Sequence, residues 1–310
     1  MSNLSAEAAR LSMISNDILI SGGLPIFICG LIGNLIDMVL FTTHPRMNQM
    51  STSIFLATSY SGSFITLLTG LLPQLVYRLT HYDPLAKYEV LCKLRWFLGV
   101  GTATVAVHSL CFATVNQFLV TTNSVRCRNL ITKRRAIILC TFIYIYCAGL
   151  LAPNLFYYKH VLNAVNQTIC DVPNPIVSSY NAYTSLIIYT LIPMSVLILF
   201  SLLTLKNIRK QLHRRLDLEK TVTRVLFAQV IIVLIATVAY CIRRIYQLYT
   251  ANIRKDTVRI AQDDIITSVS TLFGFSIHGF TFIVFFAISD AFRSNVLSLR
   301  PRRQRRVGCV

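Results

Sequence analysis

Cysteine is the residue type in this chain with the clearest capacity for covalent chemistry. The sequence has nine cysteines, and most of them lie in or beside apolar stretches, where a single thiol usually serves as a packing residue. Cys92 and Cys170 are placed differently, because Cys92 begins an apolar stretch and Cys170 lies in a polar segment. If both face an oxidising compartment, we expect a disulfide between them; the alternative is two free thiols.

The sequence has no arrangement of residues that is typical of an enzyme or a metal site. It lacks a CxxC pair, a histidine and cysteine cluster at zinc-binding spacing, a glycine-rich phosphate loop and a Ser/His/Asp or Cys/His constellation. His108 and His278 lie in apolar stretches, where hydrogen-bonded packing is a more common role than metal binding. We therefore expect neither catalysis nor a cofactor or bound metal.

Two adjacent arginines, Arg243 and Arg244, lie near the end of an apolar stretch. A charged side chain inside a membrane is costly and is therefore often functional. The two guanidinium groups could receive an acidic group or the C-terminal carboxylate of a ligand. Alternatively, both side chains extend along the helix to the membrane surface, and the sequence leaves both readings open.

The composition indicates a membrane protein. Of the 310 residues, 54% are hydrophobic and only 14% are charged, whereas soluble domains carry roughly 25% charged residues. The formal net charge of +18 would suggest nucleic-acid binding in a soluble protein. Here the basic residues lie in short segments between apolar stretches and are not interleaved with aromatic residues, so we expect no nucleic-acid partner.

Seven long apolar stretches follow one another along the chain. Each has roughly 20 residues or more, the length that a helix needs to cross a bilayer, whereas the strands of a membrane barrel would be shorter and alternating. We therefore expect an all-α membrane protein, a bundle of seven transmembrane helices. The expected helices cover residues 18–43, 52–77, 92–121, 136–158, 180–205, 225–249 and 265–288.

The basic residues predict how these helices are oriented. Lysine and arginine accumulate on the cytoplasmic side of membrane proteins, and here they concentrate in the segments 126–135, 206–224 and 293–306. This orientation places the N-terminal segment, residues 1–17, outside the cell. Residues 18–288 form the membrane-spanning bundle, and the basic tail, residues 289–310, lies inside the cell. The expected location is the plasma membrane.

Two glycosylation sequons agree with this orientation. Asn3 and Asn166 both begin an Asn-x-Ser/Thr pattern, and both fall in segments expected outside. The pattern is short, so unmodified asparagines are an open alternative. On the same orientation Cys92 and Cys170 face the oxidising side, which favours a disulfide over free thiols.

Several short motifs occur at characteristic places along the expected helices. They are Gly33-Asn34 in the first, Leu56-Ala57 in the second, Pro153 at the end of the fourth, Pro193 in the fifth, and Ser289-Asp290-Ala291-Phe292-Arg293 after the seventh. With a cysteine that opens the third helix and another in the second outer segment, this pattern resembles the rhodopsin-like (class A) G-protein-coupled receptors. The resemblance implies a seven-helix bundle with a short amphipathic helix after the seventh helix, an extracellular ligand and a heterotrimeric G protein.

Two of the matching residues have a clear physical role in a bundle that is surrounded by lipid. Asn34 can form hydrogen bonds to neighbouring helices where water is absent. Pro193 leaves a carbonyl without its helical partner and loosens the fifth helix locally. Such residues also occur in other multi-helix membrane proteins, so the order and spacing of the motifs carry the resemblance.

The chain departs from the family at its switch motifs. Tyr60 stands where the second helix of the family has an aspartate that helps to bind sodium, which argues against sodium regulation. The sixth helix lacks the family's tryptophan and proline. The other replacements are Asn116, Gln117 and Phe118 for Asp-Arg-Tyr, and Phe282 and Phe285 for the proline and tyrosine of Asn-Pro-x-x-Tyr. The arginine that engages the G protein is therefore missing.

Residues that the chain lacks narrow the ligand class. Amine receptors of the family carry an aspartate seven residues after the third-helix cysteine, where this chain has Gly99. Opsins need a lysine in the seventh helix, and residues 265–288 contain none. The overall pattern is most like invertebrate neuropeptide receptors, and Gly99, Arg243 and Arg244 are the candidate pocket residues.

Two classes of function are compatible with this sequence. The first is a ligand-activated receptor that signals to a heterotrimeric G protein through its inner segments, with Asn116, Gln117 and Phe118 in the coupling region. The second is a non-signalling or scavenging protein of the same fold, which the missing switch residues favour. A transporter or channel is a third and less favoured class of function, since the sequence shows no acidic relay or broken-repeat pattern. The basic tail is expected to bind membrane lipids of the inner leaflet, and Cys309 is a lipidation candidate.

Overall fold

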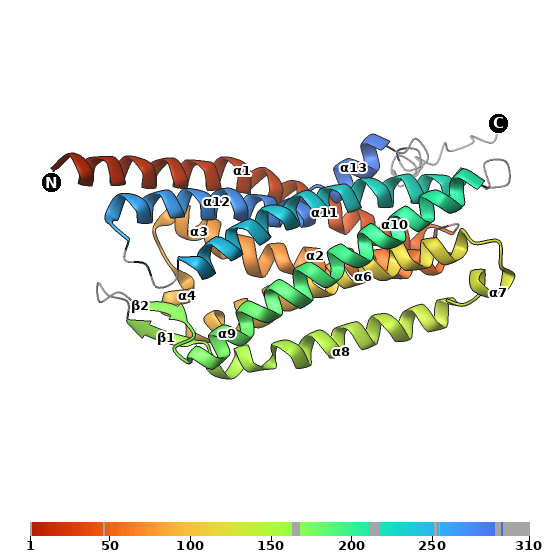
Figure 1. Cartoon of the computed structure of the whole chain (residues 1–310), viewed down its shortest axis with the longest axis horizontal. Coiled ribbons are helices and arrows are strands. Elements are labelled where there is room, and N and C mark those ends of the chain that lie inside the picture. Colours follow the sequence, from red (N-terminus) through yellow and green to blue (C-terminus); the bar gives the residue numbers. More distant parts are fainter. Residues whose placement is uncertain are drawn as a thin grey trace, which may run out of the picture.

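The computed structural model is a bundle of long helices that run side by side (Figure 1). It describes residues 2–45, 47–162, 168–210, 217–250, 253, 255–288 and 293, without the side chains of residues 2–4, 210, 217–222, 225 and 288. We call the end of the bundle at which α1 (Ser2–Thr43) begins the amino end, and the opposite end the carboxyl end.

The first four spans are helices, two of which contain a π-helical turn. The first span is α1, and the second consists of α2 (Ser51–Thr66), η1 (Leu67–Leu71) and α3 (Leu72–Thr80). After the short α4 (Pro84–Lys87), the third span consists of α5 (Glu89–Leu94), η2 (Arg95–Gly99) and α6 (Val100–Val120). The short α7 (Val125–Arg128) leads to the fourth span, α8 (Lys133–Tyr157).

A hairpin and three more spans complete the described fold. The strands β1 (Lys159–Leu162) and β2 (Thr168–Asp171) pair antiparallel, with His160 opposite Cys170. The fifth span consists of α9 (Pro175–Thr184), η3 (Ser185–Leu191) and α10 (Ile192–Lys210); the sixth is α11 (Asp217–Tyr249); and the seventh consists of α12 (Thr257–Gly279) and α13 (Thr281–Ile288). The hairpin adds a small β element to a fold predicted as all-α.

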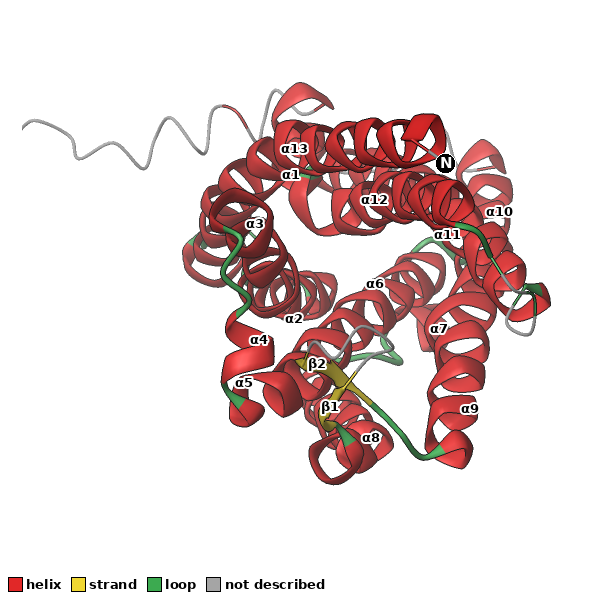
Figure 2. Ribbon diagram, turned by 90° about the vertical axis from the view of Figure 1, so that its left-hand side faces the viewer, coloured by secondary structure: helices red, strands yellow, loops and turns green. Residues whose placement is uncertain are grey.

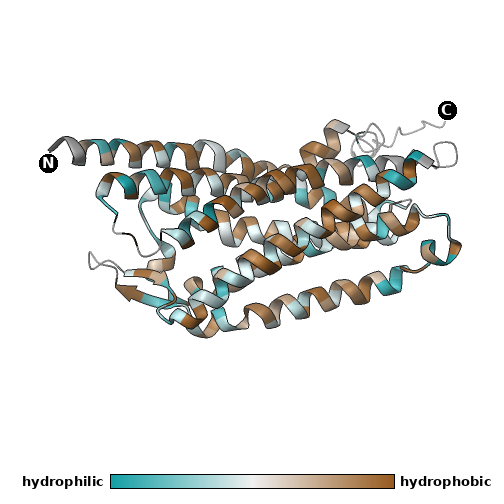
Figure 3. Cartoon of the chain, viewed as in Figure 1, coloured by the Kyte–Doolittle hydropathy of each residue, from teal (hydrophilic) through white to brown (hydrophobic). Residues whose placement is uncertain are grey.

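The predicted seven-helix membrane bundle is confirmed. Six helical runs are long and apolar enough to cross a membrane, and α12 with α13 forms a bent seventh. The middle of the bundle is largely hydrophobic, and hydrophilic residues are more frequent toward its two ends (Figure 3). Many large hydrophobic side chains of the spans are exposed on the protein surface. This distribution suits a surface surrounded by lipid between two aqueous ends.

The expectation of one unbroken seventh helix is wrong. The axes of α12 and α13 differ by 56°, and Phe280 between them leaves the helical conformation with φ −99° and ψ 2°. The bend has no proline. Asn34 of α1 donates a hydrogen bond from Nδ2 to the carbonyl oxygen of His278 at 2.7 Å, so this backbone group at the bend has a partner inside the apolar bundle.

The first helix is longer than the sequence predicted, because it begins at Ser2 instead of residue 18. Residues 5–11 read SAEAARL and consist mostly of strong helix formers without glycine or proline, so the helix continues beyond the apolar stretch. The predicted N-terminal segment 1–17 is therefore helical from Ser2 onward. The predicted amphipathic helix after the seventh span lies outside the described residues, apart from Arg293.

Two prolines explain where the second and fifth spans widen. Proline has no N–H group and clashes with the carbonyl four residues earlier, and a π-helical turn moves this carbonyl out of the way. The turn η1 ends two residues before Pro73, and η3 ends two residues before Pro193. The predicted loosening of the fifth helix by Pro193 thus takes the form of a π-helical turn.

The first and seventh spans approach one another so closely that only glycine fits between them. A Cβ atom on Gly30 would lie 2.8 Å from the Cα atom of Gly279, and one on Gly33 would lie 2.4 Å from the Cβ atom of Phe282. Small residues permit this kind of close helix packing in membranes. Gly33 of the Gly33-Asn34 pair therefore has a packing role, while Asn34 supplies the hydrogen bond next to it.

Candidate functional site

A disulfide joins Cys92 of α5 to Cys170 of β2, which confirms the predicted pair. The two Cα atoms are 5.6 Å apart, and 78 residues separate the cysteines in the sequence. The bond fastens the hairpin to the third span at the amino end of the bundle, where Figure 2 shows the hairpin in front of α6 and α8. Cys92 packs with Tyr158, Val172 and Val177 in a small apolar cluster.

An aromatic pair lies next to this disulfide, and the guanidinium group of an arginine contacts one of its rings. The rings of Trp96 and Tyr158 are stacked, with centroids 4.9 Å apart and planes inclined by 14°. The guanidinium carbon of Arg95 lies 5.3 Å from the centroid of the Trp96 ring, which is a cation–π contact. Arg95 and Trp96 both belong to η2, and π-helical turns occur frequently at functional sites.

Arg243 and Arg244 point into the bundle. Their neighbours Ile242 and Ile245 are 64% and 58% exposed and occupy the outward side of α11, whereas the Nε atoms of both arginines are buried. Both side chains are therefore directed inward, and their role in ligand binding stays a prediction.

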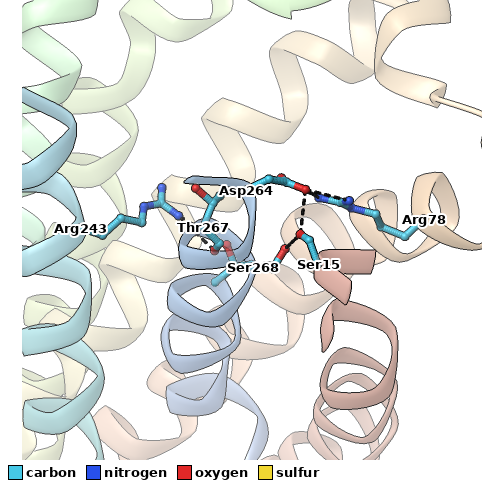
Figure 4. Close-up of polar contacts among 7 residues, drawn as sticks. Ser15, Arg78, Arg243, Asp264, Thr267 and Ser268 are labelled. Atoms are coloured by element: carbon cyan, nitrogen blue, oxygen red, sulfur yellow. Dashed lines mark hydrogen bonds and ion pairs between the residues drawn. The ribbon is translucent and has the colours of Figure 1, made fainter. Parts of the chain in front are cut away.

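The contacts of the two arginines are weak and neutral. Arg243 Nη1 lies 3.5 Å from the carbonyl oxygen of Thr267 on α12 (Figure 4). Arg244 Nη1 donates to Oε1 of Gln247 at 3.3 Å, within its own helix. Neither arginine forms an ion pair with a described residue, and both Nε atoms lack a hydrogen-bond partner.

Asp264 of α12 links three spans at the amino end (Figure 4). Its carboxylate forms an ion pair with Arg78 of α3, with Nη2 and Oδ1 3.0 Å apart. Ser15 of α1 donates a hydrogen bond to Oδ2 of Asp264 at 2.7 Å, and its Oγ lies 2.8 Å from Oγ of Ser268. One carboxylate thus connects the first, second and seventh spans.

Tyr60 lies at the centre of the bundle and is only 1% exposed. Its ring packs against Phe41 of α1 and Phe285 of α13, with centroid distances of 5.6 and 6.0 Å. An aromatic ring therefore occupies the position at which the family resemblance implied an aspartate. A buried carboxylate is nevertheless close by, because Asp37 of α1 lies within electrostatic reach of Tyr60.

Neutral contacts join the third span to the second and fifth spans in the carboxyl half of the bundle. Asn116 Nδ2 donates hydrogen bonds to Ser51 Oγ at 2.9 Å and to Thr52 Oγ1 at 2.7 Å. The ring of Phe118 packs edge-to-face on Phe200 of α10, with centroids 5.5 Å apart. Asn116 and Phe118 therefore hold α6 against its neighbours.

Gln117 connects the third span to the sixth. Its Nε2 donates a hydrogen bond to Oγ1 of Thr223 on α11 at 2.5 Å, and we call this bond the latch. The two side chains are 3% and 4% exposed, so the bond is shielded from water. Both residues line a small pocket between the third, fifth and sixth spans, together with Thr114, Ser201, Thr204, Leu226 and Phe227.

The comparison with known protein families agrees with this geometry. The family described as "7 transmembrane receptor (rhodopsin family)" matches residues 33–289, which run from the Gly33-Asn34 pair to the end of the seventh span. This chain belongs to the rhodopsin family of seven-transmembrane receptors. Proteins of this family are receptors rather than enzymes.

In this rhodopsin-family receptor most of the predicted site residues separate into two groups. The disulfide and the inward-facing arginines lie at the amino end, and Asn116, Gln117 and Phe118 lie in the carboxyl half. Gly99 belongs to neither group, because it packs at the contact between the second and third spans. A Cβ atom there would lie 3.4 Å from Oγ1 of Thr69 and 3.7 Å from N of Gly70.

The predicted modification sites of the receptor stay predictions. Asn166 and Cys309 lie outside the described residues, and only the backbone of Asn3 is described.

The sequence reading missed several residues of the receptor's amino end. Arg95 lies three residues after Cys92 in the same apolar stretch, and its charge is the signal that also singled out Arg243 and Arg244. The stacking of Trp96 on Tyr158 depends on how the hairpin folds back onto the third span. The Arg78–Asp264 pair joins residues that are 186 positions apart, and no local pattern predicts such a contact.

Proposed function

We propose that this rhodopsin-family receptor lies in the plasma membrane with its amino end outside the cell, binds an extracellular ligand there, and signals to a heterotrimeric G protein at its carboxyl end. Two observations support this orientation. The basic residues of α7 and of the first turn of α8 lie at the carboxyl end, as expected for the cytoplasmic side. The Cys92–Cys170 disulfide lies at the amino end and requires an oxidising compartment.

A peptide is the ligand class that we propose for the amino end. The sequence pattern is most like that of neuropeptide receptors, and an amine ligand would lack the aspartate that Gly99 replaces. The disulfide holds the hairpin beside the aromatic pair of Trp96 and Tyr158, and aromatic and arginine side chains are the commonest anchors for peptide and protein ligands.

The observation that carries the signalling part of the proposal is the latch between Gln117 and Thr223. It is a hydrogen bond between the third and sixth spans, and both of its residues line a small pocket that the fifth span also borders. A ligand that favours a second arrangement of the helices would break the latch and move α11 outward, which opens the pocket to a G protein.

The switch is altered relative to the family. The arginine of the family can pair with acidic residues at rest and with the G protein in the active state, whereas Gln117 is neutral and shorter. Replacing a charge-assisted contact in a shielded site by a neutral one changes its contribution by roughly 1.5–3 kcal/mol. We propose that the weaker engagement of the G protein dominates, because Phe285 also lacks the hydroxyl of the tyrosine that it replaces.

A non-signalling or scavenging protein of the same fold is the second candidate function. The observation that favours it is the use of Gln117, since its amide is directed at Thr223 and no cation stands at this position to meet a G protein. The two candidates share the ligand site and differ only at the carboxyl end.

Retention of a heterotrimeric G protein by the receptor distinguishes the two candidate functions. Membranes with the receptor are incubated with purified heterotrimeric G proteins, depleted of nucleotide and washed, and the retained heterotrimer is then released with a GTP analogue. Signalling predicts retention above receptor-free membranes and release by the analogue. If epitope tags confirm a surface-exposed N-terminus and no heterotrimer of any class is retained, the scavenging function stands in place of signalling.

A further inference from the structure

Most carboxylates at the amino end already have a partner. Glu89 pairs with Lys93 at 2.7 Å, Asp263 with Lys255 at 2.5 Å, and Asp264 with Arg78 at 3.0 Å. Asp83, Asp256 and Asp171 accept hydrogen bonds from the backbone N–H groups of Leu85, Arg259 and Val172. In contrast, Arg95, Arg243 and Arg244 form no ion pair with any described residue.

Arg95 and Arg244 come from different spans, but both affect the pKa of the Tyr158 phenol. Tyr158 follows α8, and its pKa is raised above the ordinary value mainly by burial and further by Asp171. Arg244 and Arg95 both oppose this shift and lower the pKa.

The packing of the spans places both arginines near Tyr158. Trp96, next to Arg95, stacks on Tyr158. Tyr240, one helical turn before Arg244, is hydrogen-bonded to Ser185 of the antiparallel fifth span, so Arg244 lies level with Asn181, one turn after Val177, which packs with Tyr158.

Several hydrogen-bonding groups around Tyr158 have no partner. They are the indole Nε1 of Trp96, both amide atoms of Asn181 and Nε of Arg244, all of which are buried. A buried donor without an acceptor costs roughly 1–3 kcal/mol, and native proteins seldom leave several of them together. Three of these four atoms are donors, so the missing partner is an acceptor with more than one lone pair.

We propose that Arg95 of η2 and Arg244 of α11 bind a carboxylate of the extracellular ligand, with Trp96 and Asn181 as further hydrogen-bond donors. This inference rests on the proposed function and names the chemistry that its ligand carries. A guanidinium group offers two parallel N–H donors that match the two oxygens of a carboxylate. The stacked rings of Trp96 and Tyr158 offer an apolar surface to the part of the peptide next to the carboxylate.

A lipid headgroup is a poorer match for these donors. The outward side of α11 near Arg244 carries Ile242 and Ile245, so the arginine faces away from lipid. On the other side, the disulfide places β2 next to the third span, and Tyr158 and Cys92 share one cluster with Trp96 beside it. The donors therefore face the interior of the bundle, where a ligand from the aqueous side arrives.

Affinity selection with synthetic hexapeptides tests the proposal. Three mixtures are offered to the purified full-length receptor in nanodiscs: peptides without acidic side chains that end in a free carboxylate, amidated peptides with Asp or Glu, and amidated peptides without acidic residues. Retained peptides are identified by mass spectrometry. We expect enrichment from one or both carboxylate-bearing mixtures and none from the third.

Variants connect the enrichment to the site. Arg95→Gln and Arg244→Gln should each reduce it about 10- to 150-fold, the ratio that corresponds to the loss of one charge-assisted contact. Arg10→Gln is the matched control, because Arg10 is an exposed arginine of α1 at the same end, and it should leave the enrichment unchanged. If both arginine variants fail to fold, Asn181→Leu serves instead and should also reduce it.

Two results would overturn the proposal. One is enrichment of neutral amidated peptides as strong as that of the carboxylate-bearing ones. The other is a folded receptor that retains no peptide, or an anionic lipid in place of one, or peptides whose retention survives all three variants. The heterotrimer retention assay measures G-protein binding at the carboxyl end, independently of the proposed carboxylate site. Retention of the heterotrimer without peptide enrichment would refute the carboxylate site alone, and peptide enrichment without the heterotrimer would refute signalling alone.

Discussion

Gln117 of α6 and Thr223 of α11 are joined by one neutral hydrogen bond, with Nε2 and Oγ1 2.5 Å apart. A neutral hydrogen bond contributes on the order of 0.5–1.5 kcal/mol to the state that contains it. This hydrogen bond between the third and sixth spans is therefore a modest contact, beside the apolar packing of Leu226 and Val230 of α11 in the core.

Removal of the latch is expected to favour the open arrangement of the helices. Thr223→Val keeps the shape of the side chain and removes the hydroxyl, so nucleotide exchange on a heterotrimeric G protein without added ligand should rise about 2- to 10-fold. Thr223→Ser keeps a hydroxyl and should stay near the wild-type rate.

Thr204→Val is the matched control for this substitution. Thr204 lines the same pocket, but its hydroxyl donates to the carbonyl oxygen of Phe200 in its own helix. An equal rise in exchange for Thr204→Val and Thr223→Val would show that pocket polarity, and not the latch, sets the basal rate.

The close approach of the first and seventh spans predicts a sharp difference between two glycines of α12. A Cβ atom on Gly279 would lie 2.9 Å from the carbonyl oxygen of Ile26, whereas one on Gly274 would meet nothing within 4 Å. Gly279→Val should therefore destabilise the bundle by about 1–3 kcal/mol or more, and Gly274→Val should not. The apparent melting temperature of each purified variant in detergent measures the difference, and equal melting temperatures would refute this packing.

The ion pair between Arg78 and Asp264 is expected to couple the second and seventh spans. Arg78→Gln and Asp264→Asn should each lower the melting temperature, and the double variant should lower it by less than the sum, with a coupling energy of about 0.5–1 kcal/mol. Lys93→Gln in the exposed Glu89–Lys93 pair is the control and should have little effect. Strict additivity of the two substitutions would mean that the pair contributes nothing to stability.

Asp37 of α1 is fully buried, and neither of its carboxylate oxygens has a hydrogen-bond partner among the described residues. A carboxylate without a partner is costly in an apolar interior. Asp37→Asn keeps the size of the side chain without the charge, so it should raise the melting temperature. Asp17→Asn, on the exposed side of the same helix, should leave it unchanged; a drop for Asp37→Asn alone would show that the carboxylate has a stabilising partner.

Much of this architecture could be predicted from the sequence, because membrane-spanning helices depend on the length and polarity of local segments. The limits of the fourth helix were predicted within three residues, as 136–158 against Lys133–Tyr157. The disulfide was predictable because Cys92 and Cys170 were the cysteines best placed outside. The direction in which Arg243 and Arg244 point was not, because both sides of that segment of α11 are accessible to a long side chain.

Features that depend on contacts between distant segments could not be predicted from the sequence. The 56° bend after Gly279 has no proline as a signal, and its carbonyl partner comes from Asn34, 244 residues away from His278. Gln117 was singled out from the sequence, but its hydrogen bond to Thr223 depends on how α11 is placed against α6.

The central claim is that the receptor signals through a weakened switch, and nucleotide exchange tests it most directly. Binding of a GTP analogue to heterotrimeric G protein is measured in membranes with equal surface amounts of wild type, Gln117→Leu, and the double variant Asn116→Asp with Gln117→Arg. We expect a low wild-type rate above that of receptor-free membranes and a rate at least about 10-fold higher for the double variant. Gln117→Leu should rise less, because it only removes the latch. Rates equal to those of receptor-free membranes for all three proteins would contradict signalling, and a high wild-type rate that the double variant does not increase would contradict the weakened switch.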